Sequence, residues 1–292
     1  MNDKRHTFSQ EDVQLMLNEM TKYTDEQVKE VLQKILPDTP EAHNNFYRGK
    51  VLTDEYSLND IYEMVEARNY HDIFVGDKII VEMGKIPKTN YAGGTTTFLV
   101  AEIESHWNYG DDNKLPLNKG HLLLIPQNTL GVAKMNNNTQ DGAYEGSEMN
   151  RTIMEEVQGV LENAFGNEHI LTAKEILTDS IDPNYLSKGV PNQKGCSDTW
   201  AWYEKKCRLM TELEVYGSSC FSSSGYDDAG LSHQISLFRL NHKAISIRES
   251  WWLSSVSYSN SFCLVCSLGN VNRDNAAGPS SYGVRPRFII GT

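Results

Sequence analysis

The sequence predicts a mixed α+β domain preceded by a separate helical segment. Residues 9–36 carry apolar side chains at spacings of three and four, the period of an amphipathic helix. From residue 73 onward, short runs rich in β-branched and aromatic residues alternate with Gly, Asn, Ser and Asp, which is typical of strands joined by turns. A further helical pattern at 151–165 interrupts the strands, and we expect it to pack on their sheet.

Composition indicates a folded, acidic chain. The 292 residues include 39 Asp and Glu against 27 Lys and Arg, a net charge of −12, and 39% of them are hydrophobic. This apolar content suffices for a core, and the length fits one large domain or two modest ones. Nucleic acids and anionic lipids are bound by clustered Lys and Arg, so we expect no nucleic-acid partner.

No apolar run reaches the roughly 20 residues of a membrane-spanning helix, so we expect no membrane insertion. The N-terminus lacks the apolar stretch of a secretory signal, which predicts synthesis in a cytoplasm. Five cysteines, an odd number, predict free thiols. Cys263 and Cys266 are three apart on a predicted strand and should point to opposite faces, so we expect no shared metal.

The segment 1–36 is predicted to be a helical oligomerisation segment. Ser9 with Asp12 forms one capping box, and a second begins at Thr24. Pro37 ends the helical pattern. One helix or two short ones would present an apolar stripe, which favours self-association in a coiled coil or bundle over the alternative of packing on its own domain. The stripe consists of Val13, Leu17, Met20, Val28, Val31 and Ile35.

Residues 37–56 are predicted to form a linker, and the main domain is expected to span 57–292. Ser57 and Asp60 cap a short helix at its entrance. The helix at 151–165 should end at Gly166, and another short helix is expected at 172–177. Strands are predicted at 73–83, 95–103, 121–126, 210–217, 235–240, 251–255, 261–269 and 282–290.

The last 42 residues have the composition of a recognition surface. Eight Ser, four Asn and four Gly surround two Tyr and two Trp. Rigid aromatic side chains among small polar ones are typical of binding loops. Trp251 and Trp252 are consecutive, so one should enter the core and the other face a loop or a partner. The candidate ligand-binding residues are Trp251, Tyr258, Asn260, Asn270, Asn272, Arg273, Asn275 and Tyr282.

Catalytic signatures are absent from the sequence. No G-x-S-x-G elbow, H-E-x-x-H pair, Walker loop or G-x-G-x-x-G motif after a strand occurs, and the eight histidines are scattered. A glycan hydrolase would need a pair of carboxylates in a cleft, whereas the C-terminal loops contain only Asp274. We therefore expect a protein that is not an enzyme and has no metal or cofactor.

Ordered blocks of the chain resemble the C-type-lectin-like domain of phage and prophage virion proteins from Gram-positive bacteria. The longest, WWLSSVSYSNSFCLVCSLGNVNRDNAAGPSSYGVRPRFII, is similar to the end of that domain. Earlier blocks are similar in order: DIYEMVEARNYHDIFVGDKI, HWNYGDDNKLPLNKGHLLLIPQN, GAYEGSEMNRTIMEEV and AWYEKKCRLMTELEVYG. Ser254 stands where the family usually has Arg, so contacts through that Arg are not carried over.

The resemblance implies a twisted, mostly antiparallel sheet flanked by two helices, with paired N- and C-terminal strands and long loops on one face. The turn at 257–260 and the loop at 270–282 would lie on that face. The implied function is a head fibre, capsid decoration or tail-fibre adhesin that binds a host-cell glycan or protein, or an environmental surface. The alternative is a purely structural capsid or baseplate component without a host ligand.

The resemblance also implies how the protein assembles. Residues 1–36 would attach to other virion proteins and form a homo-oligomer, with a trimer expected as for other phage fibres. Several copies would gain avidity, so each loop surface needs only weak affinity. The protein would be located in the virion, assembled in the host cytoplasm and released by lysis. Calcium-lectin triplets such as Glu-Pro-Asn are missing, so calcium-dependent sugar binding is not implied.

Overall fold

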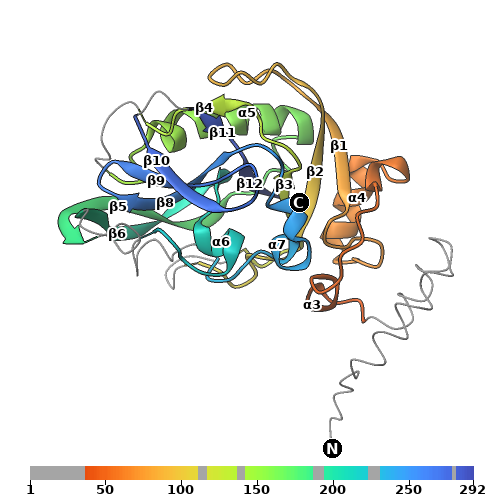
Figure 1. Cartoon of the computed structure of the whole chain (residues 1–292). Helices are drawn as coiled ribbons and strands as arrows, with labels where there is room; N and C mark the ends of the chain where they lie inside the picture. The colour runs from red at the N-terminus through yellow and green to blue at the C-terminus, as the bar shows by residue number, and fades with distance from the viewer. Residues whose placement is uncertain (1–36, 111–116, 137–141, 187–193, 223–230, 278–280) are drawn as a thin grey trace, which may run out of the picture.

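The computed structural model describes residues 37–110, 117–136, 142–186, 194–222, 231–277 and 281–292. These residues form a mixed α+β fold of mostly antiparallel sheets with few helices (Figure 1). This confirms the predicted α+β class. The segment 1–36, with all six residues of the predicted apolar stripe, lies outside the described residues.

The first sheet has the strand order β1-β2-β3-β12-β7, and every neighbouring pair in it is antiparallel. The C-terminal strand lies between β3 and β7, so the expected pairing of N- and C-terminal strands is wrong. The three strands predicted between residues 73 and 126 are confirmed, although the first begins at Lys78 instead of residue 73. The strands are β1 (Lys78–Met83), β2 (Gly94–Ile103), β3 (His121–Pro126), β7 (Cys207–Leu209) and β12 (Pro286–Gly291).

The second sheet has the order β10-β9-β8-β11-β4, with one parallel pair between β11 and β8. Residues 271–275, expected within a loop, form a strand because they pair with β9. A separate hairpin is made by β5 (Ala173–Leu186) and β6 (Lys194–Lys205). The strands of the second sheet are β4 (Val132–Ala133), β8 (Trp251–Tyr258), β9 (Ser261–Val265), β10 (Val271–Asn275) and β11 (Tyr282–Gly283).

Two predicted helices are confirmed. In α4 (Leu58–Glu66), Ser57 accepts a hydrogen bond from the Asp60 backbone N–H and completes the capping box. The second, α5 (Met154–Phe165), follows a π-helical turn at Met149–Ile153 and ends at Gly166, whose φ is 90°. A positive φ is strained for residues with a Cβ atom, which explains why a glycine ends this helix.

Three other predicted elements have the wrong type. The helix expected at 172–177 is the start of β5, where Ala173, Glu175 and Leu177 are buried on one face and paired with β6. The strands expected at 210–217 and 235–240 are instead the helices α6 (Glu212–Tyr216) and α7 (Ser236–Leu240). In α6, a capping box at the N-terminus and left-handed Gly217 at the C-terminus outweigh the alternating pattern.

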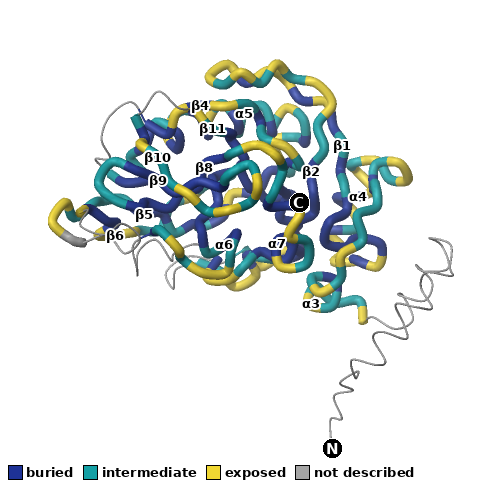
Figure 2. The backbone as a smooth tube through the Cα atoms, viewed as in Figure 1, coloured by how far each residue is buried: buried dark blue, intermediate teal, exposed yellow. Residues whose placement is uncertain are grey.

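Buried hydrophobic residues of the two sheets form two cores. Figure 2 shows that long stretches of the strands in both sheets are buried. The first core includes residues of α4 and α5, and the second includes residues of α6 and α7. Along β3, Leu122 and Leu124 belong to the first core and Leu123 to the second. Side chains of a strand alternate between faces, so burial of both faces explains the uninterrupted apolar run of this strand.

Residues 38–56, within the expected linker, lie against the domain, and we call them the strap. They include the short α3 (Pro40–His43) and a 3-10 turn (Leu52–Asp54). Tyr47 and Val51 form parallel bridges with Val75 and Lys78. The strap therefore covers the outer edge of β1, where unpaired backbone groups would otherwise be open to another chain.

Arg48 holds the strap to the domain through two buried carboxylates. Its Nη1 donates to Asp72 Oδ1 at 2.6 Å, and its Nη2 donates to Asp77 Oδ2 at 2.6 Å. The Arg48 Nε also donates to Asp77 Oδ1 at 3.1 Å. The Asp77 side chain is fully buried and that of Arg48 is 15% exposed. Asp77 therefore depends on Arg48 for compensation of its charge.

We predict that Arg48→Met lowers the free energy of unfolding by about 3 kcal/mol, because it leaves Asp77 buried without its cation. Urea unfolding followed by circular dichroism measures this loss. The matched control is Arg151→Met, which breaks an ion pair with Glu145 whose Arg side chain is 61% exposed. An exposed pair contributes little, so the control should change stability by no more than about 0.5 kcal/mol. Equal effects of the two substitutions would contradict the assigned role of Arg48.

Candidate functional site

Several predicted binding residues lie at β10, the edge strand of the second sheet. Asn272 and Asn275 are exposed, Arg273 is half-buried, and Asn270 is exposed just before the strand. Asn260 lies in the turn between β8 and β9, where its carbonyl accepts a hydrogen bond from the Ala276 N–H at 2.9 Å. The turn and the two ends of β10 therefore form one continuous polar surface, which we call the β10 surface.

Both faces of β10 contact aromatic side chains. The Arg273 guanidinium lies 4.8 Å from the centre of the Phe221 ring and 6.0 Å from that of Tyr258, within the range of cation–π attraction. On the other face, the Tyr282 hydroxyl donates to Asp274 Oδ2 at 2.7 Å. These contacts hold Arg273 and Tyr282 in one conformation before a ligand binds. Ligand binding therefore costs little side-chain conformational entropy at these two residues.

Trp251 does not belong to this surface. Trp251 lies in the second core and Trp252 in the first, and both are fully buried. The expectation that one of them faces a loop or a partner is wrong because both faces of β8 are covered. Cys263 lies in the second core and Cys266 packs against the first, which confirms that these thiols point to opposite sides.

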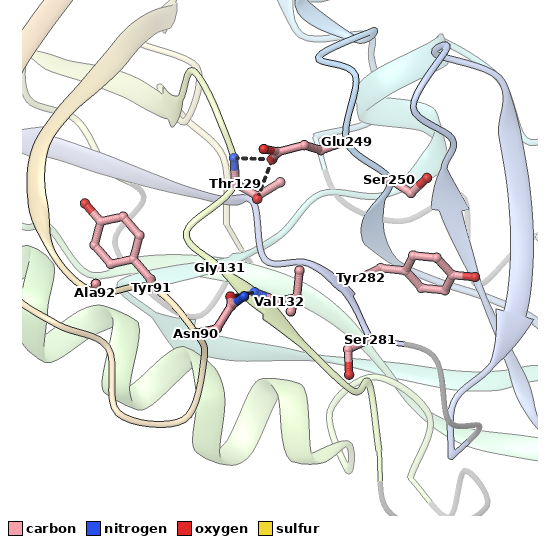
Figure 3. Close-up of a pocket in the computed structure, with 10 residues that line it drawn as sticks. All are labelled: Asn90, Tyr91, Ala92, Thr129, Gly131, Val132, Glu249, Ser250, Ser281 and Tyr282. Atoms are coloured by element: carbon pink, nitrogen blue, oxygen red, sulfur yellow. Dashed lines mark hydrogen bonds between the residues drawn. The ribbon is translucent and has the colours of Figure 1, made fainter.

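A depression of about 530 Å³ lies beside Tyr282, and we call it the tyrosine pocket (Figure 3). Figure 3 shows Tyr91 and Tyr282 on opposite sides of it, with Glu249 above Val132. Of its lining residues, the sequence prediction included only Tyr282. The described residues that line it are Asn90, Tyr91, Ala92, Thr129, Gly131, Val132, Glu249, Ser250, Ser281 and Tyr282.

Hydrogen bonds fix two walls of the tyrosine pocket. Glu249 Oε2 accepts from the Thr129 hydroxyl at 2.6 Å and from its backbone N–H at 3.3 Å. Asn90 Oδ1 accepts from the Val132 N–H at 2.8 Å. A Cβ atom on Gly131, whose φ is 79°, would lie 2.6 Å from the Tyr91 nitrogen. Only glycine therefore allows the 90–92 turn to approach this wall so closely.

A second depression of about 280 Å³ adjoins the first and shares Tyr91 and Thr129 with it. It runs along the start of β2. Small polar residues around a tyrosine are the pattern that identified the C-terminal surface, but the same residues are typical of turns. The sequence therefore offered no reason to select them. The other residues that line this second depression are Gly93, Gly94, Thr95, Thr96, Thr97, Gln127 and Asn128.

Four buried charges form a cluster that sequence reasoning also missed. Arg208 on β7 and Arg287 on β12 lie directly opposite each other in the register. Glu175 on β5 accepts from Arg208 Nε at 2.8 Å and from Arg287 Nη1 and Nη2 at 2.8 and 2.7 Å. Glu214 on α6 accepts from Arg208 Nη2 at 2.6 Å and from Arg287 Nη2 at 3.0 Å. Each carboxylate therefore bridges both arginines.

This cluster is suited to holding the fold rather than to acid–base chemistry. Burial alone raises the pKa of both carboxyl groups, but the two arginines outweigh it. The pKa of Glu175 lies well below its ordinary value, and that of Glu214 falls to about 2. A general acid needs a carboxyl that keeps its proton near neutral pH, whereas both of these are ionised. The side chains of all four residues are at most 4% exposed.

His106 and His121 adjoin the cluster as buried rings. His106 Nε2 lies 3.0 Å from Glu175 Oε1. The His121 Nε2 accepts from the His106 backbone N–H at 3.0 Å, so its Nδ1 carries the proton that it donates to the Lys119 carbonyl at 2.7 Å. Burial lowers the pKa of His121 to about 3. A proton on His121 Nε2 would turn this acceptor into a donor. Two donors would then face each other, and the hydrogen bond from the His106 N–H would be lost.

We predict that acid destabilises the fold through His121. An unfolded histidine binds its proton below about pH 6.5, whereas folded His121 stays neutral down to about pH 3. The unfolded state binds more protons in this window, so stability falls as pH falls from 6.5 towards 3, by about 2 kcal/mol between pH 7 and pH 5. His121→Gln keeps an acceptor for the His106 N–H and should remove this loss.

Urea unfolding of the wild type and of His121→Gln at pH 7, 6 and 5 measures the difference. An unchanged pH dependence in the variant would refute the assignment to His121. The ionised Glu214 adds a later loss, because its lowered pKa makes it stabilising above its unfolded pKa near 4.5 and this contribution disappears as pH falls through about 2. At pH 5 and above, where the test is made, the loss from His121 is therefore present and the loss from Glu214 has barely begun.

The described residues contain no group of three or more His, Cys, Asp or Glu side chains that could hold a metal ion. In the same part of the chain, no helix combines the length and apolar character needed to cross a membrane. Comparison with protein-family models, curated proteins and solved structures found no match to this chain. The likeness to lectin-like virion domains rests on the sequence blocks quoted above.

Proposed function

We propose that the protein is a bacteriophage virion component, a head fibre, capsid decoration or tail-tip adhesin, which binds surface ligands of a host or its environment. The observation that carries this proposal is the difference in burial between two neighbouring strands of the second sheet. All residues of β9 are buried, whereas β10 beside it presents exposed asparagines and a half-buried arginine. Residues of the β10 surface can therefore change without loss of the core, as recognition requires.

A C-type-lectin-like arrangement is the fold that we propose for residues 57–292. The ordered sequence blocks and the mostly antiparallel sheets support it. The position of β12 between β3 and β7 differs from the strand pairing that the resemblance implies. The strap extends the folded unit towards the N-terminus, beyond the expected boundary at residue 57.

A structural capsid or baseplate component is the second candidate, and the edge of β10 favours it. Among the described strands, β10 pairs only with β9, so its other edge presents backbone groups to a neighbouring chain. Such an edge is a template for pairing between chains. In this role the β10 surface would be covered by sister subunits in the particle, and no host ligand would reach it.

We further propose that residues 1–36 form the homo-oligomer, with a trimer expected, and attach it to other virion proteins. The protein would then be located in the virion. Multiple copies on one particle would raise the effective concentration of binding surfaces at a cell and strengthen a weak individual contact. The predicted stripe from Val13 to Ile35 is the basis for this assignment.

The proposal predicts that the full chain is a defined oligomer that binds Gram-positive cells, while a chain beginning at Pro37 is a folded monomer. Loss of avidity should weaken cell binding of the shorter chain by about a hundredfold or more. Light scattering measures the oligomer, and sedimentation with whole cells measures binding. The shorter chain starts at Pro37 rather than Ser57 because the strap must remain to satisfy Asp77.

Combined replacement of Asn272, Arg273 and Asn275 by Ala should abolish cell binding of the full chain without changing its oligomeric state. Glu63→Ala, an exposed change on α4, is the control and should leave binding intact. An oligomer that binds no cells would support the structural candidate instead. A monomeric full-length chain would contradict the role assigned to residues 1–36.

A further inference from the structure

The tyrosine pocket and the depression that adjoins it form one stretch of surface with almost no charge. Together they are lined by 17 described residues, of which Tyr91 and Thr129 line both depressions. Glu249 is the single charged residue among these 17, although charged residues make up 23% of the chain. The remaining lining consists mainly of hydroxyl, amide and backbone groups, which exchange hydrogen bonds with neutral partners.

Several polar groups in this stretch are left for a ligand. Glu249 Oε2 accepts both bonds from Thr129, and no bond from a described residue reaches Glu249 Oε1. Asn90 uses Oδ1 for the Val132 N–H, which leaves the two donors of its side-chain amide. Donors and acceptors that lie side by side suit a ligand whose hydroxyl groups both donate and accept.

Tyr91 is the central aromatic residue of this stretch because it lines both depressions. Its hydroxyl is hydrogen-bonded to the Thr96 hydroxyl, and its ring packs against the first core. The ring is therefore held in place before a ligand arrives. An aromatic face carries partial negative charge and attracts the polarised C–H groups on one side of a pyranose ring.

Charge argues against an anionic occupant. The single charged lining residue is a carboxylate, and the whole chain has a net charge of −12. Phosphate-bearing polymers are held by Arg and Lys, and neither type is among the 17 lining residues. A large apolar ligand would leave the hydroxyl and amide groups without partners, which is costly.

We infer that the tyrosine pocket and the adjoining depression bind an uncharged oligosaccharide, with one sugar ring placed at Tyr91. This inference rests on the proposed function, because it names the ligand class for part of the proposed binding surface. It places the ligand mainly at the 90–97 and 127–132 segments, with Ser281 and Tyr282 of the C-terminal region lining the tyrosine pocket as well. The volume of the tyrosine pocket, about 530 Å³, lies in the range of small-ligand sites.

The test uses the full chain and two kinds of soluble probe. Neutral tetrasaccharides of glucose, galactose, mannose or N-acetylglucosamine represent the proposed class, and polyglycerol phosphate represents the anionic alternative. Saturation-transfer NMR reports direct binding, and competition in the cell-sedimentation assay reports whether the same site contacts cells. At least one neutral tetrasaccharide should bind and compete, whereas polyglycerol phosphate should do neither.

Substitutions locate the binding. Tyr91→Ala should weaken the neutral tetrasaccharide about tenfold or more, while Tyr91→Phe, which keeps the ring, should stay close to the wild type. Because Tyr91 also packs against the core, thermal melting must show that the Ala variant is folded. Asn128→Arg is the second variant, since Asn128 is exposed and a long side chain there obstructs the smaller depression without disturbing the core.

The outcomes separate this inference from the proposed function. Cell binding that polyglycerol phosphate blocks and neutral tetrasaccharides do not would overturn the inference and leave the proposed function standing. Sugar binding that survives both Tyr91→Ala and Asn128→Arg would overturn the location. A full chain that binds neither cells nor any tetrasaccharide would remove the proposed function together with the inference.

Discussion

Arg208 and Arg287 stand directly opposite each other on neighbouring strands, and their like charges would separate β7 from β12 without the two carboxylates that bridge them. Glu175 is contributed by the hairpin and Glu214 by α6, so one cluster joins the first sheet to two elements outside it. Buried charges are costly to dehydrate, and removal of one partner leaves the others uncompensated. The arrangement is therefore stable only when all four elements have docked, which makes their relative placement a cooperative property of the fold.

This dependence explains which elements the sequence could predict. The helices α4 and α5 were recognisable because capping residues, apolar spacing and a terminal glycine are all local signals. The segment 172–177 was assigned the wrong type because Glu175 looks like a surface residue in its local context. The partners of Glu175 lie far away in sequence, Arg287 at 112 residues and Arg208 at 33. Tertiary pairing decided the segment 172–177, and no local pattern reports it. The segment 210–217 did contain local helix signals, the capping box of Thr211 with Glu214 and the terminal Gly217, but its alternating pattern was given more weight.

The candidate site shows the same limit. Composition selected the C-terminal asparagines, Arg273 and Tyr282. Of these, Asn272, Arg273 and Asn275 are on β10, at or near the surface. Composition also selected Trp251, because one sequence cannot show that both faces of β8 are covered. The other wall of the tyrosine pocket, at 90–92 and 129–132, approaches Tyr282 through long-range contacts such as the pairing of β4 with β11. Residues brought together by strand pairing share no sequence motif, so composition identified one side of the pocket and missed the other.

The strap changes how the proposed oligomer would present its surfaces. A flexible linker lets each domain reorient, and the effective concentration of a second binding site then falls with linker length. Here Arg48 joins the strap to two buried carboxylates, and Asn44 exchanges hydrogen bonds of 2.8 and 2.7 Å with the backbone of Ile103 on β2. The chain therefore enters the domain at a defined place and direction near residue 38. If residues 1–36 associate as proposed, flexibility between the bundle and each domain is confined to the few residues at their junction. The binding surfaces of one oligomer would then be held at nearly constant separations, which favours a ligand array of matching spacing over isolated ligands.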